Sequence, residues 1–203
     1  MRPHYFVRVL AIAFFVLVVS VAHGQNIAGT TSFCEQGMKI NNGGMMVLGG
    51  WALANMAAGA YGWSAFEGQK RYFYQMNLFW NVVNATIAGI ALSNNLGYDC
   101  SSVSYDSYLN SHLSTEKTLL INSALDVGYI GTGFLLKYFS TKASQRGDLL
   151  KGYGNSLILQ GGFLLAFDLV IYALLRNERM SFDANISASF SPIQPAFHFV
   201  YRF

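Results

Sequence analysis

Residues 72–93 read YFYQMNLFWNVVNATIAGIALS, an apolar run of about the length that crosses a lipid bilayer as one α-helix. Three asparagines interrupt it: Asn77, Asn81 and Asn84. At 3.6 residues per turn their side chains fall on one narrow stripe of the helix. Because three amides in line are unfavourable against acyl chains, the stripe predicts a membrane helix whose polar face meets other helices.

Three further apolar runs of similar length lie at 44–66, 117–139 and 153–176. The whole chain is 53% hydrophobic and only 11% charged, which is far from the composition of soluble proteins. The sequence therefore predicts an all-α, membrane-spanning four-helix bundle over residues 44–176, with the lipid bilayer as its main surroundings. A net charge of +3 is too small to favour nucleic-acid binding.

The first 24 residues have the features of a secretory signal peptide. Arg2 and Arg8 precede an apolar stretch at 9–22 that is short for a membrane crossing, and small residues follow it. Cleavage there leaves an outer segment, 25–43, before the first span. The alternative is an uncleaved first helix, and both interpretations place residue 30 outside the cytoplasm.

The loops between the runs differ in charge. The loop at 94–116 has three acidic residues and no Lys or Arg, whereas the two other loops have an excess of Lys and Arg. Loops rich in Lys and Arg face the cytoplasm, so both termini of the mature chain are expected on the outer side.

The two cysteines fit that orientation. Cys34 precedes the first span and Cys100 lies in the acidic loop, so both are on the outer side. An even pair in an exported chain predicts a disulfide that joins the outer ends of the first helical hairpin. Two free thiols or a metal pair are the alternatives. Because His112 and His198 are isolated in the outer segments, we predict no metal site and no cofactor.

Polar residues occur near the same depth in all four runs. Those at the corresponding depth in the third and fourth runs include two carboxyl groups. We expect all of them to face inward as one polar layer, together with small residues that include Ala54, Ala58 and three glycines of the third run. The candidate site residues are Asn55, Asn77, Asn81, Asn84, Asn122, Asp126, Gln160 and Asp168.

The carboxyl groups of Asp126 and Asp168 point to function. A carboxylate at the bilayer centre costs about 2.5–3.5 kcal/mol, and no Lys, Arg or His lies near their depth to neutralise them. The functional hypothesis is a site for a proton, a small cation or a polar-headed ligand. The structural alternative is a protonated Asp bonded to a neighbouring amide, and for the Asn residues it is interhelical hydrogen bonding.

Four segments carry a family resemblance: VLGGWALANMAAGAYGW from residue 47, YFYQMNLFWNVVNATIAG from 72, NSALDVGYIGTGF from 122 and KGYGNSLILQGGFLLAFDL from 151. Over about 43–176 the chain resembles a domain-of-unknown-function family of small bacterial four-helix membrane proteins. The resemblance implies the envelope of a bacterium with two membranes. Because strongly apolar helices should stop transfer at the inner membrane, we expect the protein there, and the loop charges then predict periplasmic termini. The resemblance implies no activity.

The tail, 177–203, alternates apolar and polar residues from Phe182 to Phe190 and again from Phe197 to Phe203, with prolines between. This pattern predicts a short β-hairpin on the outer face or a strand that docks a partner, with disorder as the alternative for the last residues.

No phosphate loop, nucleophile elbow, metal motif or Ser/His/Asp set is present in the sequence, so no catalytic residue is assigned. A structural or assembly subunit, as a homo-oligomer or within a membrane complex, is the main alternative to ligand binding. An intramembrane aspartyl enzyme using Asp126 and Asp168 is a more remote one.

Overall fold

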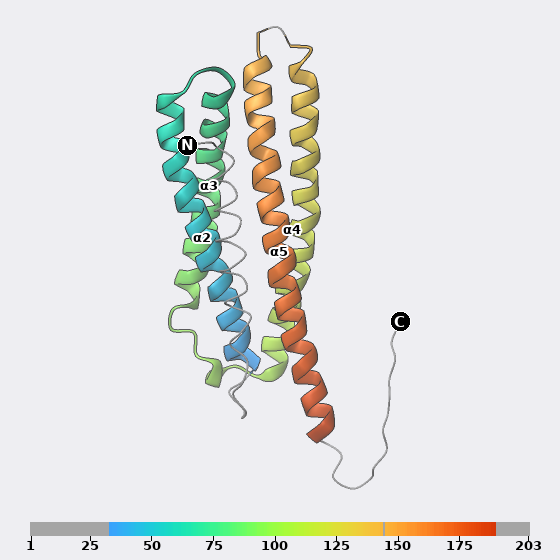
Figure 1. The fold of residues 1–203 in the computed structure, drawn as a ribbon. Coiled ribbons are helices and arrows are strands. Elements are labelled where there is room, and N and C mark those ends of the chain that lie inside the picture. Colours follow the sequence, from blue (N-terminus) through green and yellow to red (C-terminus); the bar gives the residue numbers. More distant parts are fainter. Residues whose placement is uncertain (1–32, 144, 190–203) are drawn as a thin grey trace, which may run out of the picture.

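The computed structural model describes residues 33–143 and 145–189, and the signal peptide predicted at 1–24 lies outside them. The described chain is helical, with no strand in this part of the sequence. Figure 1 shows the helices side by side as one elongated bundle. The elements are α2 (Phe33–Ala65), α3 (Gly68–Asn95), the short 3₁₀ helix η1 (Cys100–Ser102), α4 (Tyr105–Ser140) and α5 (Gly147–Ser189).

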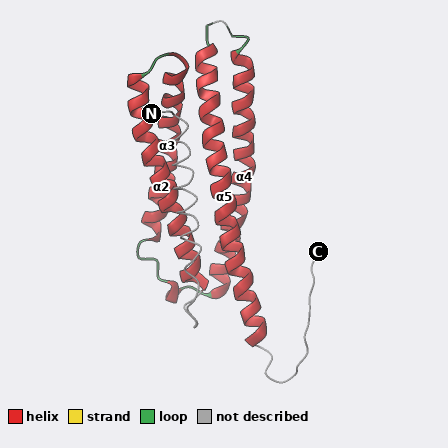
Figure 2. Ribbon diagram, viewed as in Figure 1, coloured by secondary structure: helices red, strands yellow, loops and turns green. Residues whose placement is uncertain are grey.

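The bundle consists of two antiparallel hairpins, α2 with α3 and α4 with α5. Their turns lie at the same end of the bundle, as Figures 1 and 2 show. The α2–α3 turn is tight because Gly68 adopts φ +57°, a conformation that favours glycine. Helix α5 packs against each of the other three helices and is therefore the centre of the bundle.

Three helical segments are long and apolar enough to cross a membrane: α3, α4 and residues 147–182 of α5. Helix α2 is not among them, so the prediction of four spans is supported for three. All four helices are longer than the runs predicted from the sequence. The additional turns lie mostly at the end opposite the two hairpin turns, which is where the disulfide lies.

Glycines at the helix contacts allow the helix backbones to pack closely. A Cβ on Gly133 of α4 would lie 2.7 Å from the Gly154 carbonyl oxygen of α5, and a Cβ on Gly62 of α2 would overlap the Tyr74 ring of α3. Small residues at these contacts let the backbones approach each other. The inward direction predicted for Ala54, Ala58, Gly128 and Gly131 is wrong, because all four lie on exposed faces.

The predicted disulfide between Cys34 and Cys100 is confirmed, with 5.8 Å between the two Cα atoms. It joins the first turn of α2 to η1 beyond the end of α3. Phe33, Cys34 and Tyr108 form a buried apolar cluster there, against which Phe182 of α5 packs. Phe33 stacks on Phe182 with ring centroids 5.0 Å apart. This cluster joins α2, η1, α4 and α5 at this end.

The strand predicted from Phe182 is not formed in the described residues, because α5 continues to Ser189. Small and apolar residues that alternate here are equally compatible with a helix, and no proline occurs before Pro192 to stop it. The second predicted strand, 197–203, lies outside the described residues.

Candidate functional site

The interior contains a closed network of amides that links α2, α3 and α5. Asn77 donates through Nδ2 to Asn55 Oδ1 at 2.7 Å, and its own Oδ1 accepts from Gln160 Nε2 and, at 3.5 Å, from the Ser156 hydroxyl. Gln160 Oε1 in turn accepts from the Trp51 indole N–H at 3.1 Å. These side chains therefore satisfy one another.

The indole of Trp51 is held in place by stacking on Phe163, with centroids 3.9 Å apart and planes 3° from parallel. Asn55 Nδ2 donates to the Trp51 carbonyl at 2.8 Å, and Asn81 Nδ2 donates to the Asn77 carbonyl at 2.8 Å. These groups are paired within the protein, and among the described residues none of the buried side-chain oxygen or nitrogen atoms of this network lacks a partner, so the network holds the helices together.

A groove of about 630 Å³ runs between α3 and α4. It begins near Ala91 and Ser111, toward the disulfide end, and reaches Trp80 and Tyr129 in the middle of the bundle. Side chains of α2 and α5, Leu48 and Phe167 among them, contribute to its lining. The rings of Trp80 and Tyr129 meet edge to face at 4.8 Å, and this contact closes the inner end of the groove.

The two carboxyl groups lie in this groove. Asp126 of α4 is 2% exposed and Asp168 of α5 is 6% exposed. They line the same groove from two different helices and lie close enough to interact electrostatically. Asp126 Oδ2 is the one buried side-chain oxygen or nitrogen without a hydrogen-bond partner among the residues that the structure describes. Two carboxylates cannot bond without a proton or cation between them, so the pair requires a positive charge.

The single polar layer predicted from the sequence is divided in two by the structure. Asn55, Asn77, Asn81 and Gln160 belong to the closed amide network, whereas the other four candidates line the groove. Asn84 connects the two parts, since its Nδ2 donates to Asn81 Oδ1 at 3.4 Å. The other groove candidates are Asn122, Asp126 and Asp168, of which Asn122 lies on an exposed face at the rim.

Helix α4 lines the groove with a row of hydroxyl groups. The sequence pattern did not identify these residues as candidate site residues. These residues recur at three- and four-residue spacing on one helical face that leads to Asn122 and Asp126. This spacing is the signal that would have identified them. The row is Ser111, Ser114, Thr115 and Thr118.

His112, expected to be isolated, is instead buried within a charged cluster. Its Nε2 lies 3.1 Å from the Leu175 carbonyl oxygen and 3.4 Å from Glu116 Oε1. Arg179 of α5 binds the same carboxylate with two bonds, at 2.8 and 3.1 Å. Because Arg179 is 63 residues from Glu116 in sequence, no local pattern could have paired them. This ion pair joins α4 to α5, with the Glu116 carboxylate buried and the Arg179 guanidinium partly exposed.

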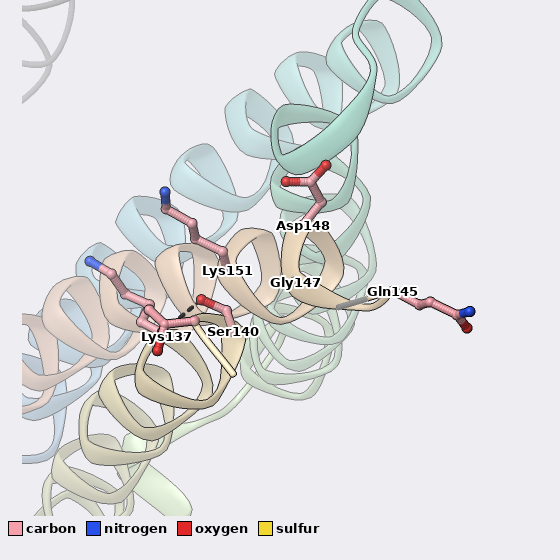
Figure 3. Close-up of a pocket in the computed structure, with 7 residues that line it drawn as sticks. Lys137, Ser140, Gln145, Gly147, Asp148 and Lys151 are labelled. Carbon is pink, nitrogen blue, oxygen red and sulfur yellow. Dashed lines mark hydrogen bonds between the residues drawn. The ribbon is translucent and has the colours of Figure 1, made fainter. Parts of the chain in front are cut away.

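A second cavity, of about 560 Å³, lies at the α4–α5 turn. Figure 3 shows the Lys137 and Lys151 side chains extending to the same side, while Gln145 extends the opposite way. Asp148 lies beside Gly68 of α3, at the other hairpin turn. The lysines give this end of the bundle its positive charge. Within the described residues, no group of three or more His, Cys, Asp or Glu side chains could hold a metal ion.

The fold and the groove define an all-α bundle of the membrane-spanning type with a carboxyl pair inside it. Residues 47–169 match DUF6992, a family of unknown function, and the chain belongs to this family. The match includes every groove residue of α3 and α4, both carboxyl groups and the amide network. Comparisons with curated proteins and with solved structures gave no match.

Proposed function

We propose that this protein is a multi-pass membrane protein that binds a positively charged species, either a proton, a small cation or the polar head of a ligand, at Asp126 and Asp168. The observation that carries the proposal is that two buried carboxyl groups line the same groove, and that Asp126 Oδ2 has no hydrogen-bond partner among the described residues. Among the described residues that line the groove, none is a Lys, Arg or His that could supply the missing positive charge. The charge must therefore come from a bound species.

All four helices cross the membrane in this proposal. Helix α2 packs along α3 in an antiparallel hairpin with a short turn, so a bilayer that surrounds α3 also surrounds α2. The polarity of α2 is explained by its contribution of Asn55 and Trp51 to the internal network, which keeps these groups away from lipid.

The charge distribution supports an orientation with both described ends on the periplasmic side of a bacterial inner membrane. Between residues 33 and 182, the half of the bundle with the hairpin turns carries six Lys and Arg and two acidic residues. The half with the disulfide carries four Lys and Arg and five acidic residues; the groove residues Asp126 and Asp168, near the middle of the bundle, are counted in neither half. The richer Lys and Arg end faces the cytoplasm, and the disulfide faces an oxidising compartment.

An assembly subunit that docks partners through its helix surface and tail is the second candidate. Large side chains such as Phe79 and Phe134 are exposed, at 52% and 56%. Contact with lipid requires the same exposure, so the observation favours membrane insertion over any specific partner.

The test compares the wild-type protein with Asp126→Asn, Asp168→Asn and the control Asp106→Asn, which removes an exposed carboxylate outside the groove. Infrared difference spectra over a pH series, with and without Na⁺ or Ca²⁺, report the protonated carboxyl band and its displacement by a cation. We expect a titrating, cation-sensitive band in wild type and Asp106→Asn that disappears in both groove variants. Identical spectra in all four proteins would overturn the proposal.

Native mass spectrometry of the detergent-purified protein tests the same site without a chosen probe. A retained ligand lost only in the groove variants supports the proposal. A defined hetero-complex that tail deletion dissociates, and that the aspartate changes do not alter, supports the assembly role instead. Loss of a measurable turnover in either aspartate variant would identify the pair as catalytic.

A further inference from the structure

We infer that the ligand of the groove is an unbranched aliphatic chain carrying a primary ammonium group, which the two carboxyl groups bind. This inference rests on the proposed function and specifies its ligand. It depends on three features of the groove: its cross-section, the hydrogen-bonding character of its polar wall and the aromatic contact at its inner end.

The shape of the groove selects a single extended chain. Its lining spans 80–91 on α3 and 111–129 on α4, which is about 17 Å and about 27 Å of helix. A volume of about 630 Å³ over these lengths gives a mean cross-section of roughly 23–37 Å². The groove is therefore long and narrow, which suits an extended aliphatic chain.

The polar wall offers several hydrogen-bond acceptors. Thr115 and Thr118 donate their hydroxyl protons to the carbonyls of Ser111 and Ser114, at 3.0 and 2.9 Å, so the hydroxyl oxygens are left with acceptor capacity. Asn84 likewise uses Nδ2 on Asn81 and leaves its Oδ1 as an acceptor. An ammonium group has three donors and no acceptor, which matches such a wall.

The head group belongs at the inner end of the groove. The carboxyl pair lies there, about one helical turn before the Trp80–Tyr129 contact. Aromatic rings beside a carboxylate favour a cationic head, because they attract it through their faces. Apolar side chains such as Val83, Ile87 and Leu164 line the groove alongside the hydroxyl row and suit the methylene groups of the chain.

Probes of equal chain length distinguish the effect of the charged head group on binding from the effect of the alkyl chain. Thermal unfolding of the protein in nanodiscs is measured with 1,8-diaminooctane and n-octylamine, and with octane-1,8-diol and n-octanol as uncharged controls. The diamine reaches the groove from water and the monoamine reaches it from the bilayer. Comparing the two amines therefore shows which of these is the source of the ligand. We expect the amines to raise the unfolding midpoint at concentrations about tenfold or more below those of the alcohols.

Asp126→Asn should abolish this difference and Asp106→Asn should retain it. Thr118→Trp fills the groove but leaves the carboxyl pair intact. Thr86→Trp is its matched control, since Thr86 makes the same hydroxyl bond to its own helix at 2.8 Å and does not line the groove. Amine binding should be lost in the Thr118 variant and kept in the Thr86 variant.

Three outcomes would overturn the inference: equal effects of amines and alcohols, ammonium chloride acting as strongly as n-octylamine, or amine binding that survives Thr118→Trp. In each case a cation-sensitive infrared band that depends on Asp126 would still support the proposed function. If that band is absent as well, both fail together.

Discussion

Replacing single glycines of α4 with alanine tests the packing of the α4–α5 hairpin. Gly131 and Gly133 are two residues apart in the same helix, yet their surroundings differ. A Cβ on Gly131 has no heavy atom within 4 Å, whereas a Cβ on Gly133 lies 2.7 Å from the Gly154 carbonyl oxygen and 3.1 Å from the Ile158 nitrogen. We expect the two substitutions to change stability in opposite directions.

Two contributions determine the change in the free energy of unfolding: the helix propensity of alanine and the packing of its Cβ. Both variants gain about 0.5–1 kcal/mol of helix stability from alanine. Ordinary contact begins near 3.4 Å, so Gly133→Ala must separate the backbones of α4 and α5 by about 0.7 Å, an overpacking that costs about 1–3 kcal/mol. Because the helix term is common to both, the difference between the variants isolates this packing cost.

The assay is unfolding by sodium dodecyl sulfate in mixed micelles, followed by tryptophan fluorescence. Trp51 is a suitable reporter because it stacks on Phe163 in the core. Gly131→Ala should unfold at higher detergent fraction than wild type and Gly133→Ala at lower. Equal shifts, or greater stability of the Gly133 variant, would show that the close approach of α4 and α5 is not what fixes this hairpin.

Three further predictions concern the disulfide end. Glu116→Ala should destabilise the bundle by about 3 kcal/mol because Arg179 loses its two bonds to the carboxylate, and Glu116→Leu with Arg179→Leu should regain most of that loss in the same unfolding assay. Replacing Cys34 and Cys100 with serine should lower the free energy of unfolding by about 2–4 kcal/mol, because the disulfide joins residues 66 apart in sequence. Unfolding of the wild-type protein with and without reductant measures this loss. Equal stability in the two conditions would contradict the prediction. The pKa of Asp99 lies below its usual value because the Ser101 hydroxyl and backbone N–H donate to it, so Ser101→Ala should raise that pKa in an NMR titration; an unchanged pKa would assign the effect to other groups.

The sequence by itself determined the class and much of the topology. Apolar runs of membrane-crossing length predicted the helices, and the even pair of cysteines predicted the disulfide, because both features can be recognised in the sequence before any packing is known. The stripe of Asn77, Asn81 and Asn84 also gave the inward face of α3 correctly, since helical period alone decides it.

Only the tertiary structure shows which of those polar groups belong to the amide network and which line the groove. Asn81 and Asn84 are three residues apart in sequence, yet one is enclosed in the amide network and the other reaches the groove, because α5 packs against α3 while α4 lies across an open space. The pairing of Asp126 with Asp168, and of Glu116 with Arg179, joins residues far apart in the chain. Which partner a buried charge finds depends on the register of whole helices, and that register is set by glycine contacts between elements that no local pattern contains.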